Sequence, residues 1–347
     1  MRRRVLVCCV VLWVLHMVAP SASGASAEET EKAVNVAVDR LLAAQQGDGS
    51  WKEPDELHGG TGYDVGRTAL VALALSRSGS PKVSRSVRGG LHFITHHAPE
   101  AKTYTAGLAV MLLVEEDPER YRKLIELYAS MVVKGQRLEG PGAGGWTYGI
   151  LNPTAGTSVA RAGRTDNSNT QFAVMALHWL EKTGRRIPKV TWKLLKHHYE
   201  INQNRDGGWS YLGAAAERAS GQEPSASTLS MTAAGSVSLH LTERALNRAR
   251  GTVPRTVQAG IDWIAKSQLA GPAYTWLALQ RLGTHTGRDK FGDKDWRALG
   301  TDSLVTRLNG RPDSVPNEAL ALLFLAGARA SVDDPKLTID GEHRDEP

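Results

Sequence analysis

Two aspartates occupy matching places in the sequence and could do chemistry together. Asp64 stands four residues before Thr68, and Asp166 stands four residues before Thr170, at the start of two similar apolar segments. If both segments are helices in the same phase, both carboxylates lie at one end of the assembly. Two carboxylates at one mouth could act as general acid and base or bind a cation. Asp is also a favoured N-cap residue that complements the helix dipole, so capping alone explains both positions.

The segments behind these aspartates belong to a series that repeats along the chain. Five members begin with Thr and reach Leu seven residues later, and a sixth carries Glu318 in the place of Thr. They lie at residues 68–75, 105–112, 170–177, 232–239, 275–282 and 317–325. Helices that are apolar nearly all round are buried inside a larger assembly, so we predict six inner helices. The Thr hydroxyls could bond backbone or form a ring around a pore, and the sequence leaves both open.

A second set of segments, one before each inner helix, has a one-sided apolar stripe interrupted by charges. That pattern is typical of a helix with one face in water. These outer segments lie at residues 31–46, 83–97, 119–136, 190–203, 257–268 and 295–308. Each hairpin of outer and inner helix has an apolar face that only a neighbouring hairpin can cover. We therefore predict an all-α fold, an α/α toroid of six helical hairpins or (α/α)6 barrel, as one domain over residues 28–330.

Three outer segments end in a Gln that is followed by a glycine-rich turn and a Trp. The pairs are Gln46 with Trp51, Gln136 with Trp146 and Gln203 with Trp209. Glycine stops a helix by adopting positive φ, and the indole can cover the turn while Gln bonds loose backbone. With inner segments such as 166–177, these turns resemble the QW repeats of the squalene cyclase and protein prenyltransferase superfamily, above all its exported bacterial prenyltransferase and squalene oxidase repeat proteins. The resemblance covers residues 30–330 and implies a terpenoid cyclase-like toroid with a cavity on its axis.

The motifs that carry that superfamily's chemistry are absent from the sequence. Family cyclases use an Asp-x-Asp-Asp acid and related enzymes bind magnesium through Asp-Asp-x-x-Asp, and neither string occurs. Protein prenyltransferases hold zinc with Asp, Cys and His, and the only cysteines, Cys8 and Cys9, lie in a predicted leader. The resemblance thus implies a protein that binds a ligand in or over its axial cavity without cyclising it. A lipid, an isoprenoid, a peptide or a glycan could be that ligand, and we expect no cofactor and no metal.

The first 27 residues are organised like a secretory signal peptide. Arg2, Arg3 and Arg4 precede an apolar run that is too short to span a bilayer well, and small residues up to Ala27 follow. We predict cleavage near Ala27, export to the periplasm or the extracellular space, and no transmembrane span in the mature chain. Without the leader, 39 basic and 36 acidic residues remain and form no basic stripe, so we expect no nucleic-acid partner. We predict that the charged tail at residues 331–347 is disordered.

Two long loops rich in Gly, Ser and Ala, residues 140–165 and 207–227, each lead into an inner segment. Loops of that length in a compact repeat are usually functional or disordered, so we expect them to rim the cavity. The predicted ligand-binding rim consists of His58, Tyr63, Arg67, Tyr104, Trp146, Tyr148, Arg164, Asn167, Trp209, Tyr211 and Tyr274.

Three alternatives to a non-catalytic binding protein stay open. A divergent terpenoid cyclase-like enzyme would use Asp64 and Asp166 at the inner-helix mouth. A polysaccharide lyase needs a Tyr or His base beside a cation that neutralises the uronate carboxylate, and His58, Tyr63 and Arg67 could supply these roles. A purely structural envelope protein would use its outer face for protein partners, and a narrow axis filled by side chains would favour it.

Adjacent histidines in the outer segments, such as His197 and His198, invite a metal-site interpretation. Neighbours on a helix point about 100° apart and do not easily grip one ion. We therefore expect these pairs to be solvated ends of helices.

Overall fold

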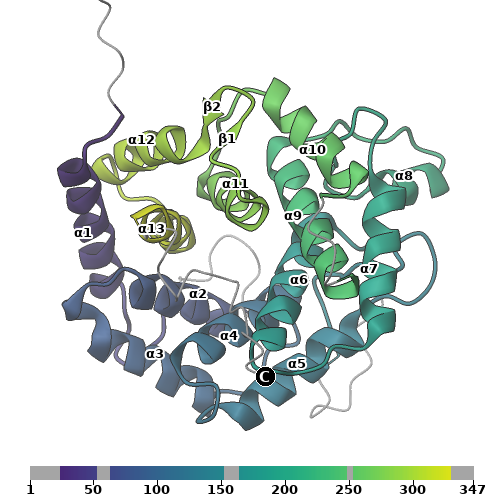
Figure 1. Ribbon diagram of the computed structural model, residues 1–347. Helices are drawn as coiled ribbons and strands as arrows, with labels where there is room; N and C mark the ends of the chain where they lie inside the picture. Colours follow the sequence, from purple (N-terminus) through teal and green to yellow (C-terminus); the bar gives the residue numbers. More distant parts are fainter. Residues whose placement is uncertain (1–23, 53–62, 152–163, 248–252, 330–347) are drawn as a thin grey trace, which may run out of the picture.

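The computed structural model describes residues 24–52, 63–151, 164–247 and 253–329, and the regular secondary structure of this part of the chain is almost entirely helical. The inner helices are α2 (Asp64–Arg77), α4 (Thr103–Glu116), α6 (Asn167–Lys182), α9 (Leu229–Leu246), α11 (Ala273–Thr286) and α13 (Val315–Arg329). Each packs against the next along the chain, and α13 packs against α2, so the inner helices form a closed ring (Figure 1). The predicted six-hairpin toroid is confirmed.

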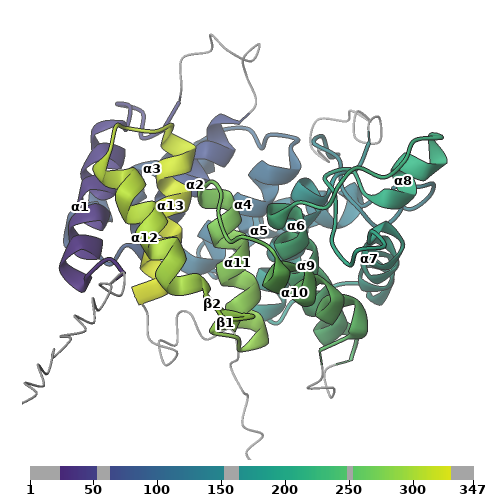
Figure 2. The same cartoon turned by 90° about the horizontal axis from the view of Figure 1, so that it is seen from above.

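The outer helices surround this ring. They are α1 (Ala27–Ala43), α3 (Ser84–His96), α5 (Arg122–Gly135), α7 (Lys189–Asn202), α10 (Arg255–Lys266) and α12 (Trp296–Asn309). Helix α1 packs against α12 and α13, so the first hairpin meets the last, and the helices stand side by side around the ring (Figure 2).

Burial along single helices explains the two layers. In α4 every residue from 105 to 113 is buried, as expected for a helix enclosed on all sides. In α10 the buried residues are Val257, Gly260, Ile261 and Ile264, a one-sided stripe at helical spacing. The apolar pattern of the sequence therefore decides which helices face water.

Short elements between the hairpins were not predicted. They are the 3-10 turn η1 (Pro81–Val83), the helix α8 (Ala214–Ala219), and the two-stranded hairpin β1 (Lys290–Phe291) with β2 (Lys294–Asp295). Helix α8 lies within the second long loop, and the small hairpin leads into α12. All are too short to give a periodic signal in the sequence.

The Gln-Trp turns have one geometry in three hairpins. In the turn after α5, the Gln136 side chain donates to the carbonyls of Gly144 and Thr191, both at 3.0 Å, and so ties this turn to α7. Gln203 makes the matching bonds after α7, to Gly207 and Thr256. After α1 the donor is Gln45, so the sequence-based choice of Gln46 was wrong by one residue.

Glycine and tryptophan complete each turn. Gly144 has a φ of +85°, and a Cβ there would lie 2.1 Å from the carbonyl oxygen of Leu194, so only glycine fits. The buried indole of Trp146 donates to the Val132 carbonyl at 2.8 Å, and its backbone N–H donates to Oγ1 of Thr170 at 3.1 Å. Trp51 with Thr68 and Trp209 with Thr232 repeat this pair. In these three hairpins, the Thr hydroxyl bonds backbone.

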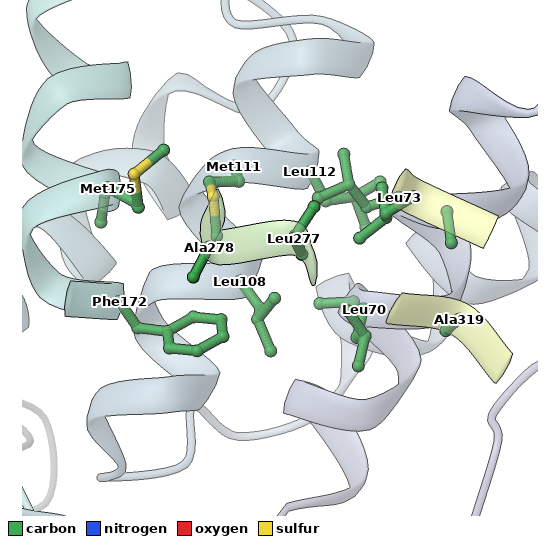
Figure 3. Packing of buried hydrophobic residues seen from close by; sticks show 14 of the residues in the cluster. Leu70, Leu73, Leu108, Met111, Leu112, Phe172, Met175, Leu277, Ala278 and Ala319 are labelled. Carbon is green, nitrogen blue, oxygen red and sulfur yellow. The ribbon is translucent and has the colours of Figure 1, made fainter. Parts of the chain in front are cut away.

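Apolar side chains from five inner helices lie together within the ring (Figure 3). The labelled ones are Leu70 and Leu73 of α2, Leu108, Met111 and Leu112 of α4, Phe172 and Met175 of α6, Leu277 and Ala278 of α11, and Ala319 of α13. Each is at most 6% exposed. Such burial requires close packing, so the middle of the ring is lined and narrowed by apolar groups.

The beginning of the described chain bears on the predicted leader. Ser26 caps α1 and Glu29 closes a capping box with it, so Ser26 is part of the folded ring although it precedes the predicted cleavage point. Residues 1–23 of the leader, the charged tail at residues 331–347 and His58 lie outside the described residues. Within the described ranges no helix is long and apolar enough to cross a membrane.

Candidate functional site

Tyrosines gather at the end of the ring where the inner helices begin, which we call the mouth. The Tyr104 hydroxyl donates to Oγ of Ser168 at 2.7 Å, and the Tyr104 and Tyr148 rings have centroids 6.1 Å apart. The hydroxyls of Tyr148 and Tyr211 are hydrogen-bonded to each other. We call Tyr104, Tyr148 and Tyr211 the tyrosine cluster. Tyr148 is 48% exposed and Tyr211 is 39% exposed, so the cluster presents aromatic surface to solvent.

Backbone hydrogen bonds hold the two exposed tyrosines in place. The Tyr148 carbonyl accepts from the N–H of Thr103 at 3.0 Å, at the start of α4. The Tyr211 carbonyl accepts from the N–H of Asn167 at 2.9 Å, at the start of α6. These bonds therefore attach the two tyrosines to the first turns of two neighbouring inner helices.

Three predicted rim residues are structural instead. Trp146 and Trp209 are fully buried in their turns, where the indoles bond backbone carbonyls. Asn167 is 1% exposed and bonds the Ser210 carbonyl and the His198 ring. The polar side-chain atoms of these three residues are already hydrogen-bonded within the protein, so we assign them a structural role.

The two aspartates are not equivalent in the structure. Asp166 is 2% exposed, caps α6, and accepts from the hydroxyl of Ser168, the N–H of Asn169 and the Asn169 side chain. Asp64 is the first residue of α2, makes no capping bond in the described part of the chain, and lies 3.6 Å from the Arg67 guanidinium with its side chain 40% exposed. Capping thus explains Asp166, and Asp64 is the accessible carboxylate.

Glu100 is a further carboxylate at the mouth, and sequence analysis missed it. Its Oε1 accepts from the N–H of Val65 at 2.9 Å, and its Oε2 accepts from the Thr105 hydroxyl at 2.7 Å. Glu100 therefore joins the first turns of α2 and α4. The only signal in the sequence is an acidic residue shortly before an inner helix. Glu100 stands five residues before Thr105, so it does not share the four-residue spacing of Asp64 and Asp166.

Aromatic rings continue from the tyrosine cluster into the ring. The Phe172 ring lies 4.6 Å from Tyr104 and 6.4 Å from Tyr274, centroid to centroid. The Tyr274 hydroxyl donates to Oε1 of Gln171 at 2.6 Å. The guanidinium of Arg281 lies 5.8 Å from the Phe172 centroid. Gln171 and Arg281 were not predicted, because they fall inside apolar helices where no spacing rule marks them.

The surroundings of three of these tyrosines favour the protonated phenol. Burial is the main reason that the pKa values of Tyr104, Tyr211 and Tyr274 lie above their ordinary value. Burial also raises the pKa of Tyr63, whose ring lies 5.3 Å from the Lys102 ammonium. A lyase base must lose its proton near neutral pH, so these environments oppose that role.

Two predicted arginines and a pair of adjacent histidines differ in their exposure. Arg164 is exposed at the mouth and Arg67 lies beside Asp64. His198 is buried, which corrects the expectation of a solvated helix end, whereas His197 is exposed. Among the described residues no group of three or more His, Cys, Asp or Glu could hold a metal ion.

Comparisons with known proteins bear on the fold. No protein-family profile and no curated protein matches the sequence. Among solved structures, the chain is similar to an inactive variant of the α-1,6-mannanase GH76A of Salegentibacter sp. HEL1_6 in complex with α-1,6-mannotriose. The TM-score is 0.61 and the identity 9%, over 86% of this chain and 99% of that chain.

A second group of similar structures is the type II terpene cyclase MstE from Scytonema. The apo form has a TM-score of 0.51 at 14% identity, over 87% of this chain and 99% of that chain. Its complex with geranylgeranyl dihydroxybenzoate has the same TM-score at 13% identity, over 87% of this chain and 97% of that chain. The structural similarity establishes the fold, a terpenoid cyclase-like α/α toroid. Because the sequence identities are so low, function has to be argued from the site.

Proposed function

We propose that this protein is exported and binds a glycan over the mouth of the toroid without cleaving it. The observation that carries the proposal is the hydrogen-bonded pair of exposed tyrosines, Tyr148 and Tyr211, with Tyr104 behind them. Aromatic faces pack against the C–H faces of sugar rings, and phenol hydroxyls bond sugar hydroxyls, so tyrosine provides both contacts. The similarity to a mannanase bound to mannotriose supports the same choice of ligand.

The carboxylates support binding in preference to hydrolysis. Glycosidases use a pair of carboxyl groups that flank the scissile bond. In the described part of the mouth, the carboxylate oxygens of Asp166 and Glu100 accept hydrogen bonds from neighbouring groups. Of these three carboxylates, Asp64 is the one that remains accessible to a ligand. One accessible carboxylate does not supply an acid and a base. The apolar middle of the ring also favours a ligand whose sugar rings stack on the tyrosines at the mouth.

Calorimetric titration with α-1,6-mannotriose and a panel of neutral and acidic oligosaccharides tests this proposal. We expect the wild type to bind at least one of them and Tyr148→Ala or Tyr211→Ala to weaken that binding about tenfold or more, as a lost aromatic anchor does. Tyr121→Ala, on the outer layer beside Arg120, is the matched control and should bind normally. Binding unaffected by both tyrosine variants, or release of reducing ends from the bound sugar, would overturn the proposal.

The apolar cluster in the ring favours a second candidate, an isoprenoid or other lipid ligand. The side chains within the ring, among them Leu108, Met111 and Phe172, are apolar, as the walls of a lipid site are. Extraction and mass spectrometry of the purified protein separate the two candidates. A stoichiometric isoprenoid would favour the second candidate, and a lipid-free protein that binds sugar would favour the first.

A further inference from the structure

Arg281 of α11 lies inside the ring without an anionic partner. No hydrogen bond or ion pair joins it to another described residue; its guanidinium lies against the Phe172 ring, and the positive charge of Arg77 acts on it. It is partly exposed, yet burial lowers the pKa of its guanidinium to about 10. A charged group in such surroundings is unfavourable unless something compensates it.

Two other arginines of the inner helices have a carboxylate partner. Arg77, at the end of α2, forms an ion pair of 2.9 Å with Glu115 of α4. Arg67, at the start of α2, lies 3.6 Å from Asp64. Arg281 therefore differs from its neighbours in having no carboxylate, although it is the one that lies within the apolar interior beside Phe172.

A second unpartnered donor lies close to the same rings. Gln171 of α6 is fully buried, its Oε1 accepts from Tyr274, and its Nε2 has no hydrogen-bond partner among the described residues. Helices α6 and α11 are separated in the ring by α9, so the bond between Gln171 and Tyr274 crosses in front of α9.

We propose that Arg281 binds a carboxylate of the ligand, so that the glycan bound at the tyrosine cluster is an acidic one that contains uronate. The guanidinium fork pairs with a carboxylate in two parallel hydrogen bonds, and the Gln171 amide is a further donor on the same side. The rings of Tyr148, Tyr104 and Phe172 lead from the exposed cluster to Arg281, with centroid distances of 6.1 Å and 4.6 Å between successive rings. This inference rests on the proposed glycan binding and names its substrate class.

The missing carboxylate partner of Arg281 would make the site specific for acidic sugars. A site built to bond a charged group strongly rejects an analogue that lacks it, because the buried site group is then left uncompensated. Neutral sugars would gain only the stacking on the tyrosine cluster. Uronates would gain the stacking and the charge.

The test is calorimetric titration of wild type and variants with trigalacturonate, its methyl ester and α-1,6-mannotriose. We expect wild type to prefer trigalacturonate to its ester by about tenfold or more, and Arg281→Met to remove that preference. Arg281→Lys should restore part of it, because it keeps the charge and loses the fork. The control is Arg186→Met, an exposed arginine of the turn after α6, which should bind like wild type.

Thermal unfolding supplies an independent readout. Because Arg281 is an uncompensated cation in the free protein, Arg281→Met should unfold at a higher temperature than wild type, and trigalacturonate should raise the midpoint of wild type more than that of the variant. A lower midpoint for Arg281→Met, or equal affinity of wild type for the acid and its ester, overturns the inference.

The two proposals fail in different ways. If Tyr148→Ala loses all sugars but Arg281→Met binds the acid as tightly as wild type, glycan binding stands and the uronate inference falls. If trigalacturonate binds through Arg281 but Tyr148→Ala binds it normally, the anion site stands and the tyrosine platform falls. If wild type binds none of the three sugars, both are wrong.

Discussion

The Tyr104 hydroxyl donates a 2.7 Å hydrogen bond to Oγ of Ser168, and this bond joins the first turns of α4 and α6. Ser168 in turn donates to Oδ1 of Asp166 at 2.6 Å. The aromatic surface of the mouth is thus connected to the cap of an inner helix, so the ligand-binding residues and the residues that stabilise the ring form one network. Changes in this network affect stability and binding together.

Ser168→Ala removes the middle of that network. We expect the free energy of unfolding to fall by about 1–2 kcal/mol, because the Tyr104 hydroxyl loses its acceptor and Asp166 loses a donor. Urea denaturation measures this change. Ser230→Ala, in the first turn of α9, is the matched control and should change stability by less than about 0.5 kcal/mol. Equal stability of the two variants would show that the network contributes nothing.

Alanine substitutions of Asp64 and Asp166 should differ in their effect on the free energy of unfolding. Asp166→Ala removes a buried cap and should lower the free energy of unfolding by about 1–2 kcal/mol, whereas Asp64→Ala should cost less than about 0.5 kcal/mol. Urea midpoints with unchanged m-values measure both. Similar losses for the two variants would contradict the assignment of Asp166 alone as a cap.

The Gln-Trp turns can be tested at neighbouring residues. Gln45→Met leaves the carbonyls of Gly49 and Ser86 without their donor, and we expect a loss of about 1–3 kcal/mol. Gln46→Met should be nearly neutral, since the Gln46 side chain makes a single exposed bond to the Ala44 carbonyl. Thermal unfolding of both variants decides between the structural and the sequence-based choice of residue.

Acid should destabilise the protein through His198. Burial lowers the pKa of His198 to about 4, below the ordinary value of 6.5, so between those pH values the unfolded chain binds a proton that the folded protein does not. The free energy of unfolding should therefore be highest above pH 6.5 and fall by up to about 3 kcal/mol as pH drops to 4.

Unfolding free energies of variants measured across that range identify the residue. His198→Gln should flatten the pH dependence by about one proton, and His197→Gln, an exposed neighbour, should leave it unchanged. Burial shifts the pKa of His285 in the same direction, so part of the acid sensitivity should persist in His198→Gln. Identical profiles for wild type and His198→Gln would contradict the prediction.

The cap of α1 gives an expectation for leader removal. Cleavage after Ala27 would remove Ser26 and with it the capping box, so we expect the mature chain to begin before Ser26. Intact-mass measurement of the exported protein tests this. Ser26→Ala should lower the free energy of unfolding by about 1 kcal/mol if Ser26 stays in the mature protein.

The sequence by itself determined the ring. Apolar residues recur with helical spacing, all round in α4 and on one side in α10, and burial of these faces needs neighbours until the circle closes. The sequence also named Tyr148 and Tyr211 as rim residues, because both belong to long loops that each lead into an inner helix. Local pattern was enough for these features.

Tertiary structure alone decided which polar residues are accessible. Asp64 and Asp166 have the same spacing from a Thr, yet Asp64 has a 40% exposed side chain beside Arg67, whereas Asp166 is a buried cap bonded to Ser168 and Asn169. Trp146 looked like a rim residue and is buried, while Gln171 and Arg281 looked like interruptions of an apolar helix and lie beside the rings of the mouth. Burial, and hydrogen bonds such as that from Tyr274 to Gln171, arise from segments far apart in the chain, and spacing within one segment carries no information about them.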